Sequence, residues 1–289
     1  MFDGSNLSRR RLLQMASLVL PVSALPASAL GLAAPRPVTE DAKVGAGRGL
    51  ISDTFPSQPQ EVVREMVTVA HFDVKRVQEL VEARPSLANA AWDWGFGDWE
   101  TALGAASHTG NRPIAEYLIA RGARPTVFSA TMFGQLEVVK AFVAAQPGVQ
   151  HIRGPHGISL LAHAKMGGAG ASAVLEYLQS LGDADQAAPV ALTEADIKAL
   201  AGTYVFGIGV TQQVEITADE KTYAKMYTHP PQLTWTRKGT MGRPIFHLGE
   251  RTFYPAGATH VRIQFKEDAA GAVMTVTDAE TVLTARRKA

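Results

Sequence analysis

The segment of residues 100–125, ETALGAASHTGNRPIAEYLIARGARP, constrains the fold most, because it predicts two short helices joined by a tight turn. The small neighbours Ala105 and Ala106 allow a close approach between helices. Gly110 follows, and glycine readily adopts the positive φ that ends a helix and reverses the chain. The second half carries an apolar stripe at helical spacing, formed by Ile114, Leu118 and Ile119. Such a unit leaves one apolar face that needs a neighbour.

Three more segments fit the same frame, which indicates an array of helix pairs. Residues 70–85 lie upstream, residues 130–143 follow, and residues 157–185 come last. The positions equivalent to Gly110 are Phe72, Gly134 and Gly170. Repeat arrays bury a continuous core only when about three or more units stack. The sequence therefore predicts an α-solenoid of about four degenerate repeats over residues 59–185.

The best-defined unit resembles an ankyrin repeat, whose consensus contains TPLHxAA and closes with a GADP-like loop. Thr101 and Leu103 match the T and L, Ala105 and Ala106 the paired Ala, and Gly110 the glycine between the helices. The closing loop matches at Gly122, Ala123 and Pro125. Ankyrin arrays bind other macromolecules rather than catalyse reactions, so the resemblance implies an interaction protein.

An insertion at residues 91–100, AWDWGFGDWE, separates the first two units and holds three of the chain's four Trp residues. Large aromatic side chains on a loop are common interface anchors, because each buries a large area and loses few rotamers. We therefore predict a protein-binding finger with polar contacts from the next repeat. The predicted protein-binding residues are Trp92, Asp93, Trp94, Phe96, Trp99, His108 and Arg112. The alternative is that the rings fold back and cover the repeat core.

The first 29 residues resemble a twin-arginine export signal. The motif is formed by Ser8, Arg9, Arg10, Leu12 and Leu13. An apolar stretch follows, and the sequence ASA at residues 27–29 is a small-x-small cleavage site. The resemblance implies export to the periplasm or out of the cell, with residues 30–58 as a flexible tether. No later apolar run is long enough to span a bilayer.

Composition excludes several classes of function. The chain contains no cysteine, so disulfides and thiolate metal ligands are excluded. The net charge is +1, and removal of the predicted leader, with its three Arg and one Asp, leaves about −1. Such a balance gives no case for binding nucleic acid or an anionic membrane.

The periodicity changes after a predicted linker at residues 186–192. Thr193 and Asp196 form a capping box at the start of a short helix that ends near Leu200. Alternating apolar and polar runs follow, for example at residues 214–217 and 273–277. Residues 193–289 therefore predict six to eight short strands in a small antiparallel barrel or bent sheet. The expected fold class is α+β, with a solenoid followed by a β-barrel-like domain.

The C-terminal pattern resembles the lipocalin-like module that accompanies serine hydrolase domains of the β-lactamase type. The matching residues are Leu200, Gly202, Tyr204, Pro231, Leu233, Phe246, Thr252, Phe253, Pro255, Val261, Phe265, Gly271 and Val273. The hydrolase motifs S-x-x-K and G-x-S-x-G do not occur in the chain. The resemblance implies an accessory module with a structural or ligand-binding role.

The eight His residues form no H-E-x-x-H motif and have no Cys partner. His151, His156 and His163 lie close together in the sequence, but His163 stands near the place where ankyrin repeats commonly carry a structural His. We therefore expect no metal site, no cofactor and no catalytic residues.

The sequence favours an exported, non-enzymatic adaptor that binds an unidentified protein partner through the repeats. The alternative is a carrier whose barrel encloses a small apolar ligand. Its predicted lining is Tyr204, Phe206, Tyr223, Tyr227, Trp235 and Phe246. An open pocket of several hundred Å³, on the order of known ligand sites, would favour the carrier, and a filled interior would oppose it.

Overall fold

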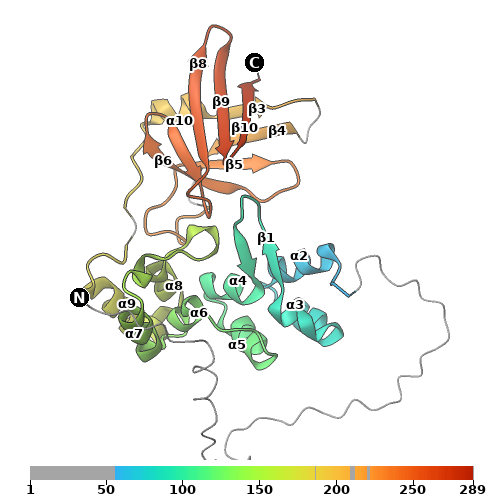
Figure 1. Cartoon of the computed structure of the whole chain (residues 1–289), viewed down its shortest axis with the longest axis vertical. Coiled ribbons are helices and arrows are strands. Elements are labelled where there is room, and N and C mark those ends of the chain that lie inside the picture. The colour runs from blue at the N-terminus through green and yellow to red at the C-terminus, as the bar shows by residue number, and fades with distance from the viewer. Residues whose placement is uncertain (1–55, 186, 209–211, 220–221, 289) are drawn as a thin grey trace, which may run out of the picture. The chain divides into compact units, whose positions relative to one another are not determined.

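The computed structural model describes residues 56–185, 187–208, 212–219 and 222–288. The predicted export signal and nearly all of the predicted tether lie outside the described residues. The described chain begins with a helical region and ends with a β-barrel (Figure 1). This order confirms the α+β class expected from the change in periodicity.

The helical region consists of consecutive helix pairs. The pairs are α2 (Gln60–Val69) with α3 (Val74–Ala83), α4 (Ala102–His108) with α5 (Arg112–Ala120), α6 (Val127–Met132) with α7 (Leu136–Ala145), and α8 (Leu160–Met166) with α9 (Ser172–Ser180). The 3₁₀ segments η2 (Pro85–Asn89), η3 (Val149–His151) and η4 (Pro155–Gly157) lie between pairs, and η5 (Gly168–Ala171) lies between α8 and α9. Helices α2, α4, α6 and α8 pack in a row, and each contacts the second helix of its own pair. The helix pairs agree with the predicted units, whereas their assignment to the ankyrin family stays a prediction.

Side-chain caps and two glycines set the ends of these helices. The capping side chains, which accept backbone N–H groups, belong to Asp73, Thr101, Asn111, Thr126 and Ser159. Gly110 (φ 69°) and Gly134 (φ 76°) occupy the predicted turns. A Cβ at Gly110 would collide with the carbonyl oxygen of Met166, and one at Gly134 with that of Gly170. Both turns therefore need glycine for its positive φ and for the close approach of a neighbouring turn.

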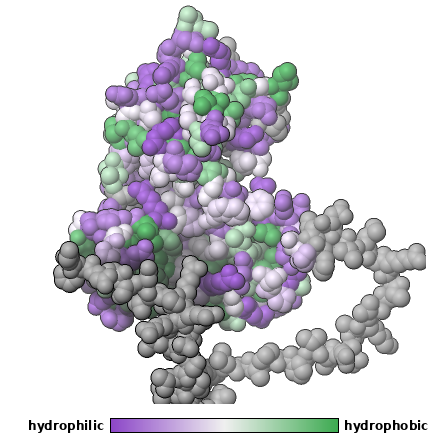
Figure 2. Space-filling model, in the orientation of Figure 1, coloured by the Kyte–Doolittle hydropathy of each residue, from purple (hydrophilic) through white to green (hydrophobic). Residues whose placement is uncertain are grey.

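The core of the helical region forms around the paired alanines. Ala105 and Ala106 are fully buried, as their size at the predicted helix contact requires. Large apolar side chains around them include Met66, Leu87, Leu103, Ile114, Leu118 and Met132. On the face drawn in Figure 2, hydrophilic and hydrophobic residues are interspersed over the described residues. The apolar residues of the repeats thus lie mainly inside, and their burial is the main source of stability.

The predicted aromatic insertion folds into a short antiparallel hairpin, β1 (Ala91–Asp93) and β2 (Trp99–Thr101). Successive side chains on a strand point to opposite faces. Accordingly, Glu100 is fully buried, whereas its neighbour Trp99 is 64% exposed. This alternation carries one carboxylate into the interior of the helical region.

The C-terminal region is a closed antiparallel barrel. It follows α10 (Glu194–Leu200), whose start carries the predicted capping box. Its strands are β3 (Gly202–Val205), β4 (Gln213–Ala218), β5 (Leu233–Arg237), β6 (Arg243–Gly249), β7 (Thr252–Pro255), β8 (Arg262–Asp268), β9 (Gly271–Asp278) and β10 (Thr281–Arg287). Each strand pairs with the next, and β10 returns to pair with β3. The predicted barrel is therefore confirmed, while the lipocalin-like family assignment stays a prediction.

Large side chains fill the interior of the described barrel. The fully buried set includes Tyr204, Ile216, Leu233, Phe253, Ile263 and Met274. The Tyr204 hydroxyl donates a hydrogen bond to the Leu200 carbonyl at 3.0 Å, so even the polar tip of this ring has a partner. These side chains pack against one another, and the carrier hypothesis stays a prediction. Among the described helices, none combines the length and the apolar character needed to cross a membrane.

Candidate metal centre

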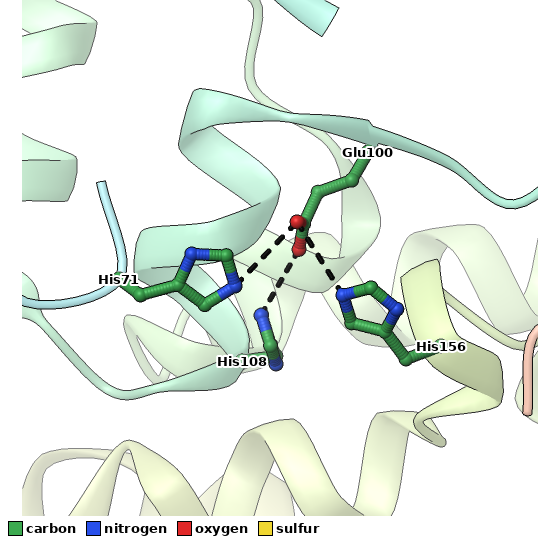
Figure 3. Close-up of side chains that lie close together, drawn as sticks. All are labelled: His71, Glu100, His108 and His156. Carbon is green, nitrogen blue, oxygen red and sulfur yellow. Dashed lines mark ion pairs between the residues drawn. The ribbon is translucent and has the colours of Figure 1, made fainter. Parts of the chain in front are cut away.

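Four side chains from distant parts of the sequence converge inside the helical region (Figure 3). His71 follows the end of α2, Glu100 lies in β2, His108 is the last residue of α4, and His156 lies in η4. Since α2, α4 and α8 pack side by side, these element ends meet at one place. Their four donor atoms all lie within 4.8 Å of one another. We call these four residues the His–Glu cluster.

The Nε2 atoms of the three imidazoles surround the Glu100 carboxylate. Nε2 of His108 lies 3.0 Å from Oε1 of Glu100. Nε2 of His156 lies 3.4 Å from Oε2, and Nε2 of His71 lies 3.5 Å from the same oxygen. None of these three Nε2 atoms has a partner with hydrogen-bond geometry, although all three are buried. The cluster therefore gathers nitrogen atoms that lie within ion-pair distance of the carboxylate but form no well-aligned hydrogen bond with it.

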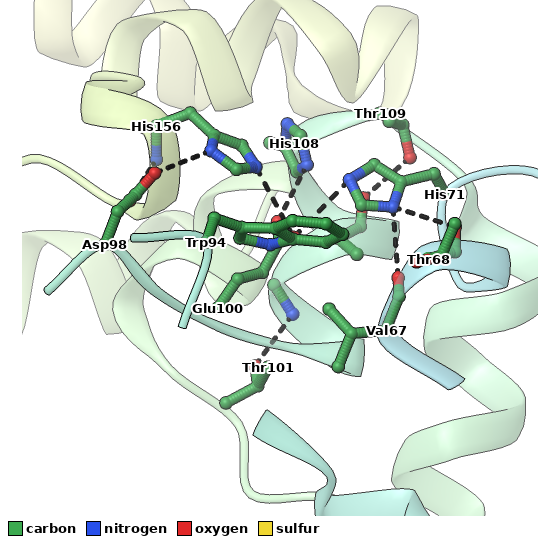
Figure 4. Close-up of polar contacts among 12 residues, drawn as sticks. Val67, Thr68, His71, Trp94, Asp98, Glu100, Thr101, His108, Thr109 and His156 are labelled. Carbon is green, nitrogen blue, oxygen red and sulfur yellow. Dashed lines mark hydrogen bonds and ion pairs between the residues drawn. The ribbon is translucent and has the colours of Figure 1, made fainter. Parts of the chain in front are cut away.

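Hydrogen bonds on the far side of two rings determine which nitrogen carries the proton (Figure 4). Nδ1 of His71 lies 3.0 Å from the carbonyl oxygens of both Val67 and Thr68. A carbonyl can only accept, so Nδ1 carries the proton and Nε2 keeps its lone pair in the neutral ring. Nδ1 of His156 donates in the same way to Oδ2 of Asp98 at 2.8 Å. A carboxylate or carbonyl behind a histidine is the usual outer-layer arrangement at metal sites.

The indole of Trp94 lies beside the cluster. Its Nε1 donates a 2.8 Å hydrogen bond to Oε2 of Glu100. The ring centroid of Trp94 is 6.1 Å from that of His156 and 6.5 Å from that of His71. Together with the surrounding backbone, this ring keeps the side chains of His71 and His156 only 15% and 13% exposed. The cluster is thus nearly closed to bulk solvent.

Burial and neighbouring charges shift the acidity of these groups. Burial alone would raise the pKa of Glu100, but the adjacent His108 and His156 outweigh it and hold that pKa far below its ordinary range. Burial lowers the pKa of His108, and Glu100 offsets this only in part. Burial also acts to lower the pKa of His156, yet Asp98 and Glu100 together raise it to about 9. Glu100 is therefore a buried anion, and the adjacent His156 ring favours its cationic form. A metal ion bound here would supply positive charge in place of that proton.

The donor set suits a divalent transition metal. Imidazole nitrogen is a good ligand for Zn²⁺, Cu²⁺, Fe²⁺ and Ni²⁺, whereas Ca²⁺ and Mg²⁺ prefer oxygen. Four donors held about 2.1 Å from Zn²⁺ at tetrahedral angles lie about 3.4 Å apart. The three distances from Nε2 to the carboxylate, 3.0, 3.4 and 3.5 Å, are close to that spacing. The four donor atoms lie within 4.8 Å of one another, so binding of an ion would draw the more distant ones closer together.

A fourth histidine lies behind His108. His163 is fully buried, and its ring centroid is 6.4 Å from that of His108. Its Nδ1 lies 2.8 Å from the Ser159 carbonyl oxygen, and burial lowers its pKa to about 3. This neutral ring bonded within α8 is in keeping with the structural role expected for it. It lies outside the set of four donors.

The structure divides the predicted protein-binding residues between surface and interior. Trp92 and Trp94 pack partly buried against the helical core, and the half-buried Phe96 packs against the barrel core. Trp99 is exposed. For Trp92 and Trp94, the structure therefore agrees with the alternative in which the rings fold back.

The polar members of the predicted set make contacts within the chain. Oδ1 of Asp93 accepts the backbone N–H of Gly95 at 2.8 Å. The Arg112 guanidinium stacks over the Phe133 ring, 4.9 Å from its centroid. His108 is fully buried and offers no surface to a partner in this conformation. It belongs instead to the His–Glu cluster.

The sequence gives no reason to expect His71 as a ligand and places Glu100 at the charged rim of the finger, whereas Glu100 is fully buried. His156 draws attention in the sequence only because it lies near His151 and His163. The positions of two histidines within the repeats nevertheless indicate that they lie close together. His71 stands one residue before the turn position Phe72, and His108 stands two residues before Gly110. Near-equivalent positions in adjacent repeats become spatial neighbours when the repeats stack. That rule brings together two of the three histidines.

Comparison with protein-family models gives no match for this chain, and comparison with curated proteins gives none either.

Proposed function

We propose that this protein binds one divalent transition-metal ion, Zn²⁺ in the first instance, through His71, Glu100, His108 and His156. The observation that carries the proposal is the convergence on one buried carboxylate of three buried Nε2 atoms that lack a well-aligned hydrogen bond. Buried polar groups in folded proteins nearly always form hydrogen bonds, so a cluster of buried nitrogens without them is the kind of lining that an ion site has. Two of the rings are already fixed in the tautomer that a metal requires.

The number and burial of the ligands favour a structural ion over a catalytic one. Four protein ligands complete a tetrahedral Zn²⁺ shell, whereas catalytic zinc sites keep one position for water or substrate. The near-closure of the cluster by Trp94 points the same way. We propose that the ion stabilises the packing of the first, second and fourth helix pairs with the hairpin. The non-enzymatic, exported character expected from the sequence is part of the same proposal.

Calorimetric titration of chelator-treated protein with ZnCl₂ tests this function. We expect one ion per chain, and CoCl₂ in its place should give the visible absorption of tetrahedral Co²⁺. Glu100→Gln keeps the shape of the side chain and removes its charge, so it should weaken binding. His71→Asn removes a ligand at the most exposed position of the cluster, where the fold is most tolerant.

Matched controls separate the cluster from general binding by histidine. His260→Asn changes a side chain that is 60% exposed on the barrel, and it should leave the affinity unchanged. Circular dichroism of each variant verifies folding. Absence of stoichiometric binding by the folded wild-type protein, or equal binding by the Glu100→Gln variant, would exclude the proposal.

A second proposal is that the protein also serves as the adaptor expected from the sequence. The observation that favours it is the exposure of Trp99 next to the buried Glu100 on the same strand. Immobilised wild-type protein should retain a partner from periplasmic extract, and Trp99→Ser should lose it. Val282→Ser, a change at another exposed apolar side chain, should retain it. Retention of the same proteins by all three forms would exclude Trp99 as the contact.

A further inference from the structure

One barrel residue reaches the hairpin that carries Glu100. Arg243, at the start of β6, donates through one nitrogen to the Trp94 carbonyl at 2.7 Å and through another to the Gly95 carbonyl at 3.2 Å. The second nitrogen also donates to the Ala256 carbonyl within the barrel at 3.0 Å. The guanidinium therefore connects the backbone of the barrel to the backbone of the hairpin.

The same guanidinium lies beside the carboxylate that orients a cluster histidine. Arg243 is 3.5 Å from Oδ2 of Asp98, and its side chain is only 12% exposed. Asp98 also accepts the backbone N–H of His156, in addition to the ring Nδ1, both at 2.8 Å. Among the described residues, the ion pairs of Asp98 are with Arg243 and His156.

A bound metal would make the contact between Arg243 and Asp98 more important. Coordination through Nε2 requires a neutral His156 ring. Arg243 is then the cationic side chain that pairs with the buried Asp98. A buried carboxylate without a cation is strongly destabilised. The orientation of Asp98, and with it that of the His156 ring, would therefore depend on Arg243.

Two more barrel residues hold the His156 loop. The Tyr227 hydroxyl donates to the His156 carbonyl at 2.8 Å. The backbone at Gly257, in the loop after β7, lies so close to Asp98 that a Cβ there would collide with the carboxylate. Ile158, next to this loop, packs in one buried cluster with Tyr227 and Phe246. The outer layer around Asp98 and His156 is therefore built largely by the barrel.

We infer that Arg243 is a positioning residue of the metal centre, so that metal affinity is coupled to docking of the barrel on the hairpin and on η4. This inference rests on the proposed metal-binding function and deepens it. Coupling between two equilibria is reciprocal. Metal binding should therefore strengthen the contact between barrel and hairpin, although no barrel residue belongs to the His–Glu cluster.

The experiment compares Zn²⁺ affinity and the Co²⁺ absorption spectrum in wild-type protein, Arg243→Met and Arg243→Lys. Loss of outer-layer partners typically weakens metal binding about 10- to 100-fold. We expect a loss in that range and an altered Co²⁺ spectrum for Arg243→Met. Arg243→Lys keeps the charge beside Asp98 and should recover part of the affinity. Thermal melting in chelator measures the structural cost of each change separately.

If the Arg243 variants do not fold, two glycine substitutions provide a second test of the same inference. Gly257→Ala pushes a methyl group into Asp98, whereas Gly239→Ala has a similar positive φ, 81° against 78°, and open space around it. Both variants carry similar backbone strain. Only Gly257→Ala should weaken metal binding and change the Co²⁺ spectrum.

The outcomes distinguish this inference from the proposed function. If folded wild-type protein binds no metal, the proposed function fails and the coupling fails with it. If wild-type protein binds metal while Arg243→Met and Gly257→Ala keep its affinity and spectrum, only the coupling is overturned. Weakened binding by Arg243→Met and Gly257→Ala, but not by Gly239→Ala, would support it.

Discussion

The indole N–H of Trp94 donates to the same Glu100 oxygen, Oε2, that is approached by Nε2 of His71 and of His156. One aromatic side chain therefore both closes the cluster and orients its carboxylate. A metal ion bound to Glu100 would lie within a few ångströms of a natural fluorophore. This relationship gives the most direct optical test of the site.

Binding of Cu²⁺ or Co²⁺ should quench the fluorescence of Trp94. Trp94→Phe should reduce the quenching, with a remainder from Trp92, which pairs with Glu100 across the hairpin. It should also weaken Zn²⁺ binding by about tenfold, because Glu100 loses an orienting donor. Trp99→Phe, at the exposed position on the other face of the hairpin, should quench as wild type does. Fluorescence titration of the three proteins measures both effects. Equal quenching in the Trp94→Phe protein would place the bound metal elsewhere.

Metal removal should lower the melting temperature. A ligand that binds only the folded state stabilises it by about 2.7 kcal/mol when its free concentration is about 100 times Kd. Differential scanning fluorimetry with and without a chelator should show this loss in wild-type protein. The Glu100→Gln variant should melt at one temperature in both conditions. A chelator effect of equal size in both proteins would argue against binding at the cluster.

Without metal, the stability of the protein should depend on the charge of His156. The nearby Asp98 and Glu100 raise its pKa from 6.5 to about 9 despite burial. The folded state then binds the proton more tightly than the unfolded state, so the stabilisation is complete below pH 6.5 and is lost as the pH rises through about 9. Thermal melts in chelator between pH 6 and pH 10 should show this decline. The decline should be absent from the His156→Asn protein, and a wild-type profile that stays flat over that range would contradict the expectation.

The turn at Gly134 should tolerate substitution less well than the turn at Gly122. Both glycines have positive φ, 76° and 90°, so alanine introduces backbone strain of about 1 kcal/mol or more at either position. Only at Gly134 would the new Cβ also collide with the Gly170 carbonyl oxygen, since Gly122 has open space around it. Overpacking of this kind adds about 1–3 kcal/mol. Urea unfolding of Gly134→Ala and Gly122→Ala measures the difference, and equal losses would show that the neighbouring turn moves aside.

Local patterns predict the elements of this fold well. Gly110 and Gly134 lie at the predicted turns, because glycine is the residue that adopts a positive φ without steric cost. The Thr193–Asp196 capping box marks the start of α10 for the same kind of local reason. Alternation along residues 214–217 and 273–277 identifies β4 and β9, since each strand has one side facing the barrel interior. Closure of the barrel by β10 and β3 depends on a distant pairing that such patterns do not encode.

The candidate centre is harder to predict because its four residues are far apart in the sequence and meet only when the helices pack. Trp99 and Glu100 are neighbours in an insertion rich in aromatic residues, and the strand phase decides which of them turns inward. His156 reaches the cluster from η4, just before the fourth helix pair, where its backbone adopts a positive φ of 59°. Nothing in residue type requires that conformation of His156. Only the three-dimensional arrangement shows that its ring faces Glu100.

The wide sequence separation of the four ligands has one more consequence. His71 and His156 are 85 positions apart (156 minus 71), and an ion bound to both would cross-link the chain across that distance. The entropy lost when a flexible loop closes grows with the logarithm of its length, so a link over so many residues strongly restricts the unfolded chain. Disulfides form such links in many proteins that contain cysteine. A chain without cysteine would here obtain the link from imidazole and carboxylate ligands, and a chelator rather than a reductant would release it.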